Sequence, residues 1–121
     1  MNWTTVLILA AVLVALLVLK RSGLISAKNA KARLKKGALV IDVRSATEFI
    51  SGHLPYAINL PLDEIEVSAS RRVKDKNRVL LLHCQSGMRS RRARKKLKAL
   101  GYANAFNLGS YGRARSILRS K

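Results

Sequence analysis

Cys84 is the only cysteine of this 121-residue chain, and it directly follows an apolar run over residues 78–83. After it come a polar loop that contains a glycine, over residues 85–89, and then a segment with helical periodicity. This order predicts a cysteine at the junction of a strand and a helix. Backbone N–H groups of such a loop and the positive end of the helix dipole favour an ionised thiol, so the sequence predicts a nucleophilic sulfur.

A buried structural thiol is the alternative for Cys84, because free cysteines are among the most buried residues of proteins. A single cysteine cannot form a disulfide within the chain, which excludes the class of disulfide-stabilised secreted domains. Cations close to a thiolate lower its pKa more than a helix terminus does, and Arg89, Arg91 and Arg92 stand in or beside the loop. Arg89, the one inside the loop, is therefore predicted to bind an anionic substrate and to stabilise the thiolate.

Alternating strands and helices are expected to position this loop. Unalternating apolar runs are typical of parallel strands that helices cover on both faces, which indicates the α/β class with a small, mainly parallel sheet. Ser26 is the predicted N-cap of the helix before the first strand, and Ser90 that of the helix after the loop. The predicted strands cover residues 38–43, 57–60, 78–83 and 104–108, and the predicted helices cover residues 27–34, 46–50, 62–73, 90–101 and 111–119.

The N-terminal segment is apolar and has no ionisable side chain before Lys20. Residues 3–19 are predicted to form a single-pass transmembrane helix, so that residues 1–22 are a membrane anchor and residues 23–121 the domain. Basic residues follow the segment, beginning with Lys20 and Arg21, and none precedes it, which predicts a domain on the cytoplasmic side. A cleaved secretory signal, with an exported and periplasmic domain, is the alternative.

The net charge of +18 favours anionic partners of several kinds, including inorganic oxyanions and lipid headgroups. The basic residues between positions 89 and 98 are interpreted as a solvated or membrane-facing helix surface. No specific nucleic-acid partner is expected, because few aromatic residues are available to stack on bases. No metal site and no cofactor are expected either, since one candidate histidine and one cysteine are too few ligands for a metal.

Three stretches in this order resemble the rhodanese family of single-domain sulfurtransferases: residues 39–44 with Glu48 and Phe49, residues 52–61, and the loop over residues 84–90. The resemblance covers residues 24–121 and implies a rhodanese-like fold. It also implies that Cys84 carries the sulfur. Tyr56 departs from the pattern, because a glycine is common there, and the segment 109–112 replaces a tighter turn. The implied substrate-binding residues are Gln85, Ser86, Gly87, Met88 and Arg89, and the implied structural residues are Asp42, Arg44, His53 and Ser90.

The resemblance implies a thiosulfate sulfurtransferase. The Cys84 thiolate would attack the outer sulfur of thiosulfate or a similar small anionic donor, and a thiol, small or on a protein, or cyanide would accept the sulfur from the resulting persulfide. A sulfur-relay or partner-binding module is one alternative. A Cys-dependent phosphatase or arsenate reductase is another, because a His-Cys pair also opens their loops. Those loops are longer than the four residues between Cys84 and Arg89.

Overall fold

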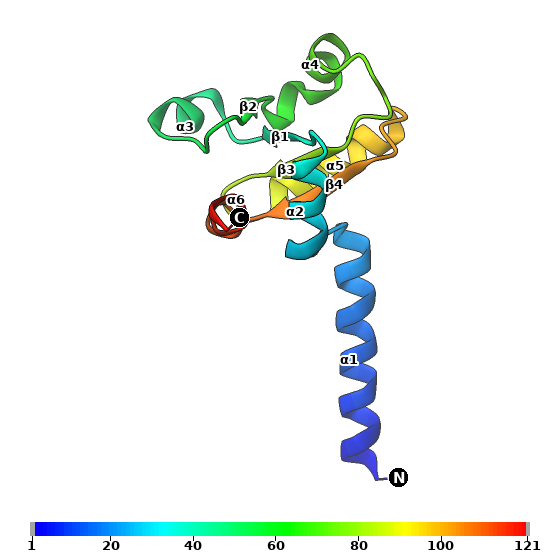
Figure 1. Ribbon diagram of the computed structural model, residues 1–121. Coiled ribbons are helices and arrows are strands. Elements are labelled where there is room, and N and C mark those ends of the chain that lie inside the picture. The colour runs from blue at the N-terminus through cyan, green and yellow to red at the C-terminus, as the bar shows by residue number, and fades with distance from the viewer. Residues whose placement is uncertain (1, 121) are drawn as a thin grey trace.

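A parallel sheet of four strands, in the order β2-β1-β3-β4, forms the centre of the domain (Figure 1). The computed structural model describes residues 2–120, with the backbone alone for residues 19–22. The predicted α/β class with a parallel sheet is confirmed. The elements are α1 (Trp3–Ser22), α2 (Ala27–Lys35), β1 (Leu39–Asp42), α3 (Ala46–Ser51), β2 (Ile58–Asn59), the 3-10 helix η1 (Leu62–Glu64), α4 (Ile65–Arg72), β3 (Leu80–His83), α5 (Met88–Ala99), β4 (Ala105–Gly109) and α6 (Tyr111–Arg119).

The central strand β3 is fully buried and divides the core in two. Leu80, Leu82 and Cys84 belong to a cluster that also contains buried residues of α4 and α5. Leu81 belongs to the other cluster, which contains buried residues of α2 and α6. Because successive side chains of a strand point to opposite faces, Cys84 faces α5 while His83 lies on the α6 side.

Local hydrogen bonds explain most helix boundaries. The Ser26 hydroxyl caps α2 by accepting a hydrogen bond from the Asn29 amide, as the sequence predicted. The prediction that Ser90 caps the helix after the loop is wrong, because α5 already begins at Met88. Gly87 is its N-cap residue, with φ of +96° and no side chain to donate or accept. Ser90 lies inside the first turn of α5, where its hydroxyl bonds to β4 instead.

Helix α1 extends away from the sheet, and its described side chains are exposed (Figure 1). Within the described part of the chain, no helix combines the length and apolarity that crossing a membrane requires. The predicted single-pass anchor over residues 3–19 is therefore not supported. The side chains of Lys20 and Arg21, expected to flank that span, lie outside the described residues.

Tyr102 provides a test of the α4 side of the core. Its hydroxyl is fully buried and lies 2.7 Å from the Val73 carbonyl oxygen at the end of α4. Replacing Tyr102 by Phe should leave this buried carbonyl without its partner and lower the free energy of unfolding by about 1–2 kcal/mol, measured by urea denaturation. Tyr56→Phe, at a residue that is 96% exposed, is the matched control and should change nothing. Equal stabilities of the two variants would contradict the assigned hydrogen bond.

Candidate functional site

Cys84 lies directly after the carboxyl end of β3, with no part of the residue exposed to solvent. Its backbone N–H donates to the Gly109 carbonyl at 3.3 Å, which continues the pairing of β3 with β4. Its sulfur accepts a hydrogen bond from the Gly87 N–H at 3.0 Å. The chain thus turns back over the sulfur and presents backbone donors to it.

Gly87 makes this turn possible. Its φ of +96° lies in the region that residues with a Cβ atom rarely adopt. A Cβ atom there would lie 3.4 Å from the carbonyl carbon of Gly109, an ordinary contact, so the requirement for glycine comes from the backbone angle. The turn leads at once into α5 at Met88, so the Ser90 N–H of the first helical turn is also directed at the sulfur.

Asn107 of β4 fixes the loop after Cys84 by side-chain hydrogen bonds. Its Oδ1 accepts the Gly109 N–H at 2.9 Å, which fixes the orientation of the amide, and its Nδ2 donates to the Gly87 carbonyl at 3.3 Å. The same Oδ1 accepts the Ser90 hydroxyl at 2.7 Å, while that hydroxyl lies 3.6 Å from the Cys84 sulfur. The Gly87 carbonyl, 3.1 Å away, is a third acceptor, and because a hydroxyl has one hydrogen, Ser90 donates to only one of the three at a time. The sulfur therefore relies mainly on backbone N–H groups.

Two opposing effects act on the pKa of Cys84. Burial raises the pKa of the thiol, because it removes water from the charged form. Hydrogen bonds from the Ser90 backbone and hydroxyl and from the Gly87 and Ser86 amides lower it and prevail, so the pKa lies below its ordinary value. The enclosed sulfur is thus a thiolate over a wider pH range than a free cysteine.

Arg89 does not extend freely beside the sulfur. Its Nη1 and Nη2 donate to the two carboxylate oxygens of Glu48 at 2.6 and 3.0 Å. Glu48 is in turn fixed at the start of α3 by a capping box with Ser45. Arg89 also lines a cavity of about 220 Å³ together with Asp63 and Glu64, where an anion would meet carboxylates. Its charge is therefore compensated, and the backbone N–H groups are the uncompensated donors at the sulfur.

Asp42 and Arg44 form a buried ion pair at the carboxyl end of β1. The Arg44 Nη2 lies 2.7 Å from an Asp42 carboxylate oxygen and also donates to the Gly52 carbonyl at 2.8 Å. Asn59 of β2 donates to the carbonyls of both Asp42 and Arg44. These bonds fix the segment after β1 to the loop before β2, and neither side chain bonds to the sulfur.

The two histidines occupy different surroundings. His83 is fully buried, and its Nε2 has no hydrogen-bond partner among the described residues, with an Asp42 carboxylate oxygen 3.7 Å away. Burial lowers the pKa of His83, so its imidazole is neutral at pH 7. His53 is exposed, stacks on the Phe49 ring and bonds through Nδ1 to the Phe49 carbonyl. In the described part of the chain, no group of three or more potential ligands gathers to hold a metal.

The structure brings together residues that the sequence had not connected. Asn107, Gly109 and Glu48 contact the loop directly, and none was predicted to do so. The signal for Asn107 was present, because an amide interrupts an otherwise apolar strand between Phe106 and Leu108. A buried polar side chain needs a hydrogen-bond partner. In a parallel sheet, the polar loop after β3 lies next to the end of β4 and is the nearest group of such partners for Asn107.

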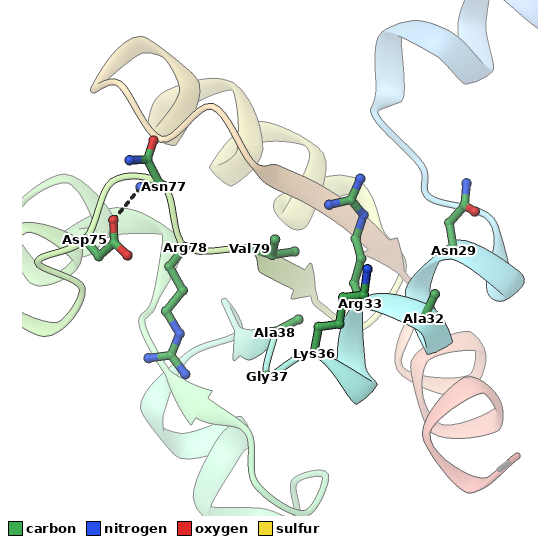
Figure 2. A pocket seen from close by; sticks show the side chains of 10 residues that line it. All are labelled: Asn29, Ala32, Arg33, Lys36, Gly37, Ala38, Asp75, Asn77, Arg78 and Val79. Carbon is green, nitrogen blue, oxygen red and sulfur yellow. Dashed lines mark hydrogen bonds between the residues drawn. The ribbon is translucent and has the colours of Figure 1, made fainter.

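A second cavity, of about 660 Å³, lies at the opposite edge of the sheet. It is lined by residues before the amino ends of β1 and β3, among them Gly37 and Arg78, whereas Cys84 follows the carboxyl end of β3. Figure 2 shows the guanidinium groups of Arg33 and Arg78 pointing in opposite directions. The Arg33 group stacks on the Phe106 ring. The two guanidinium groups therefore do not converge on one ligand position, and this cavity is separate from the Cys84 loop.

The chain is similar in sequence and in fold to known sulfurtransferase domains. A profile described as the rhodanese-like domain matches residues 26–112. Thiosulfate sulfurtransferase PspE of Escherichia coli is 35% identical over 69 residues, which cover 57% of this chain and 66% of that protein. Human thiosulfate:glutathione sulfurtransferase is 31% identical over 87 residues, which cover 61% of this chain and 76% of that protein.

The fold itself matches a solved structure. The human single-domain sulfurtransferase TSTD1 superposes with a TM-score of 0.65 at 28% identity, and the match covers 81% of this chain and 96% of that one. The chain spans a little less than two thirds of the bacterial relatives, 66% of PspE and 64% of a sulfurtransferase from Allochromatium vinosum.

The Arg89–Glu48 pair should make stability depend on pH. The Arg89 guanidinium and the Ser45 amide lower the pKa of Glu48 to about 2, from an ordinary value of 4.5. A lowered pKa in the folded state stabilises the fold above the unfolded value and loses that contribution as the pH falls towards about 2. Glu48→Gln should therefore be less stable than the wild type at pH 6, with a difference that shrinks below pH 4.5, measured by urea unfolding. A difference independent of pH would contradict the ion pair.

The state of the Cys84 thiol can be titrated directly. The rate of alkylation by iodoacetamide follows the thiolate fraction, so its midpoint should lie below the ordinary pKa of a cysteine. Ser90→Ala should raise this midpoint only slightly, because the backbone donors remain, whereas Asn107→Ala should raise it further by releasing the loop at Gly87. Circular dichroism of both variants serves as the control for folding. A midpoint at the ordinary value in the wild type would contradict the proposed enclosure of the thiolate.

Proposed function

Because the chain belongs to the rhodanese-like domain family, as its motifs predicted, we propose that it is a sulfurtransferase that carries sulfane sulfur as a persulfide on Cys84. The observation that carries the proposal is the enclosure of the Cys84 sulfur by backbone N–H groups, with a lowered pKa. The thiolate and its sulfur donor are both anions, so their reaction needs hydrogen-bond donors that stabilise negative charge and do not titrate. Backbone N–H groups meet this requirement. Residues 23–121 are the proposed catalytic domain.

Thiosulfate or a similar small anionic compound is the proposed donor. The Cys84 thiolate attacks the outer sulfur, a sulfur–sulfur bond forms, and the bond within thiosulfate breaks so that its electron pair leaves with sulfite. Three negative charges enter the step and three remain, one on the persulfide and two on sulfite. No proton moves, so the absence of an acid or base among the described bonds to the sulfur is no obstacle.

A thiol, or cyanide, is the proposed acceptor. An acceptor thiolate attacks the outer sulfur of the Cys84 persulfide, and the bond to the Cys84 sulfur breaks with its electron pair, which restores the thiolate. The name of the human relative, thiosulfate:glutathione sulfurtransferase, supports a small thiol as one class of acceptor. A sulfur relay to a thiol on a partner protein uses the same step and is the alternative.

The loop side chains receive roles in keeping with their contacts. Gln85, Ser86, Gly87 and Met88 form the wall around the persulfide, with Arg89 at its end. Arg89 contributes positive charge near the sulfur, but its bidentate bond to Glu48 makes the positioning of the loop its larger role. Ser90 can rotate its hydroxyl from Asn107 towards the sulfur as negative charge accumulates there, since both acceptors lie within its reach. Asp42, Arg44 and His53 support the segments around the site.

Burial of Cys84 fits a carrier better than an exposed nucleophile. In the persulfide, the outer sulfur stands about 2 Å beyond the cysteine sulfur, because that is the length of a sulfur–sulfur bond. We therefore expect the transferred atom to be the more accessible of the two sulfur atoms, beside a loop whose residues Gln85 and Ser86 are exposed. The shorter loop also favours a single sulfur atom over the tetrahedral oxyanion of a phosphatase.

Intact-mass spectrometry of the full chain after incubation with thiosulfate tests this function. We expect the mass to increase by one sulfur atom per chain, and the increase should disappear on treatment with excess thiol. Cys84→Ser should show no increase and should keep its fold by circular dichroism, because the substitution replaces one atom by a smaller one. No increase in the wild type, or an equal increase in the variant, would contradict the persulfide on Cys84.

A further inference from the structure

A cavity of about 580 Å³ lies between α6 and the loop over residues 53–56. We call it the α6 cavity; from α6 it is lined by Tyr111, Arg115, Leu118 and Arg119. Its lining combines two leucines, Leu54 and Leu118, with two tyrosines, Tyr56 and Tyr111. It is therefore a mixed apolar and cationic cavity on the α6 side of the sheet.

Tyr111 joins this cavity to the Cys84 loop. Its backbone N–H donates to the Gln85 carbonyl at 3.2 Å, so the first residue of α6 is bonded to the residue that follows Cys84. The Tyr111 ring packs edge-on against His83, with ring centroids 5.8 Å apart, and lies under the Arg44 guanidinium at 4.8 Å. These contacts hold the ring in one orientation. Through the Tyr111 backbone, one end of the α6 cavity is thus hydrogen-bonded to the loop that follows Cys84.

The other end of the cavity is cationic. Arg115 and Arg119 follow Tyr111 by one and two helical turns, about 6 and about 12 Å along α6. None of the described residues that line the cavity is acidic, and neither arginine forms an ion pair within residues 2–120. Two exposed cations on one helix face therefore have uncompensated charge, which suits a carboxylate rather than a neutral group.

Tyr56 gives the rim of this cavity an unusual shape. Its φ of +65° makes it the single residue other than glycine with positive φ in the described part of the chain, and it is 96% exposed. A tyrosine in that conformation is strained, and the exposure of its ring leaves no burial within the chain to offset the strain. A glycine at this position would have no such strain. The presence of a tyrosine instead indicates that its ring contacts a ligand.

We propose that the α6 cavity binds the acceptor of the sulfur, a thiol that carries carboxylates, with its sulfur at the Tyr111 end and its carboxylates at Arg115 and Arg119. The inference rests on the proposed function, because it assigns an acceptor class to the Cys84 persulfide. The acceptor thiolate attacks the outer sulfur as described above, and the bound carboxylates take no part in the bond changes. The cavity sets which thiol is used, not whether the persulfide forms.

The test compares two acceptors on the full chain loaded with thiosulfate. Glutathione is the probe with carboxylates, and 2-mercaptoethanol is the neutral probe. Replacing both Arg115 and Arg119 by Gln should lower kcat/KM for glutathione about fivefold to tenfold and leave the value for 2-mercaptoethanol unchanged. Replacing both by Lys should retain most of the preference, because the charge remains.

A matched control removes the same charge elsewhere. The Lys36→Gln, Arg78→Gln double variant loses two cations from the cavity of Figure 2, at the other edge of the sheet, and should behave as the wild type with both acceptors. An equal effect of this control on glutathione, or an unchanged preference in the Arg115, Arg119 variant, would overturn the inference. Persulfide formation is measured first by mass, and its absence in the wild type would overturn the proposed function instead.

Discussion

The hydrogen bond of 3.0 Å from the Gly87 amide to the Cys84 sulfur requires the chain to turn back on itself within three residues. This turn needs the positive φ of Gly87, and it needs a support, because a short loop with backbone donors directed inwards would otherwise open to solvent. Asn107 and Gly109 provide the support from β4, the strand next to β3. The parallel pairing of β3 with β4 thus places this support next to the loop that holds the sulfur.

The electrostatics of the site depend on the same arrangement. Two ion pairs compensate charges around the site, since Glu48 binds Arg89 and Asp42 binds Arg44. Neutral backbone donors therefore stabilise the sulfur, although the chain as a whole has a net charge of +18. The exposed cations and the buried backbone donors thus have different roles. The cations attract anions from a distance, and the donors act on the sulfur alone.

The sequence predicted the elements that depend on local patterns. Apolar runs located all four strands, and the Ser26 cap and the nucleophilic loop were recognisable without knowledge of the fold. The partners of the loop were not predictable in this way, since Glu48 lies 41 residues before Arg89 and Asn107 lies 17 residues after Ser90. The Ser90 cap was wrong because α5 already begins at Met88, directly after the positive φ of Gly87. The membrane anchor was predicted from an apolar segment followed by basic residues, and it is not supported, since no described helix is long and apolar enough to cross a membrane.

The enclosure of Cys84 also bears on the time between the two halves of the proposed reaction. A persulfide in open solution decays by oxidation or by reaction with any thiol that meets it. Because Cys84 is buried, the terminal sulfur is the more accessible atom of the proposed persulfide, and an acceptor that fits the entrance attacks it. The persulfide form of the chain then persists until it meets its acceptor. The rate of encounter with the acceptor, and not side reactions of the persulfide, therefore determines the lifetime of the intermediate.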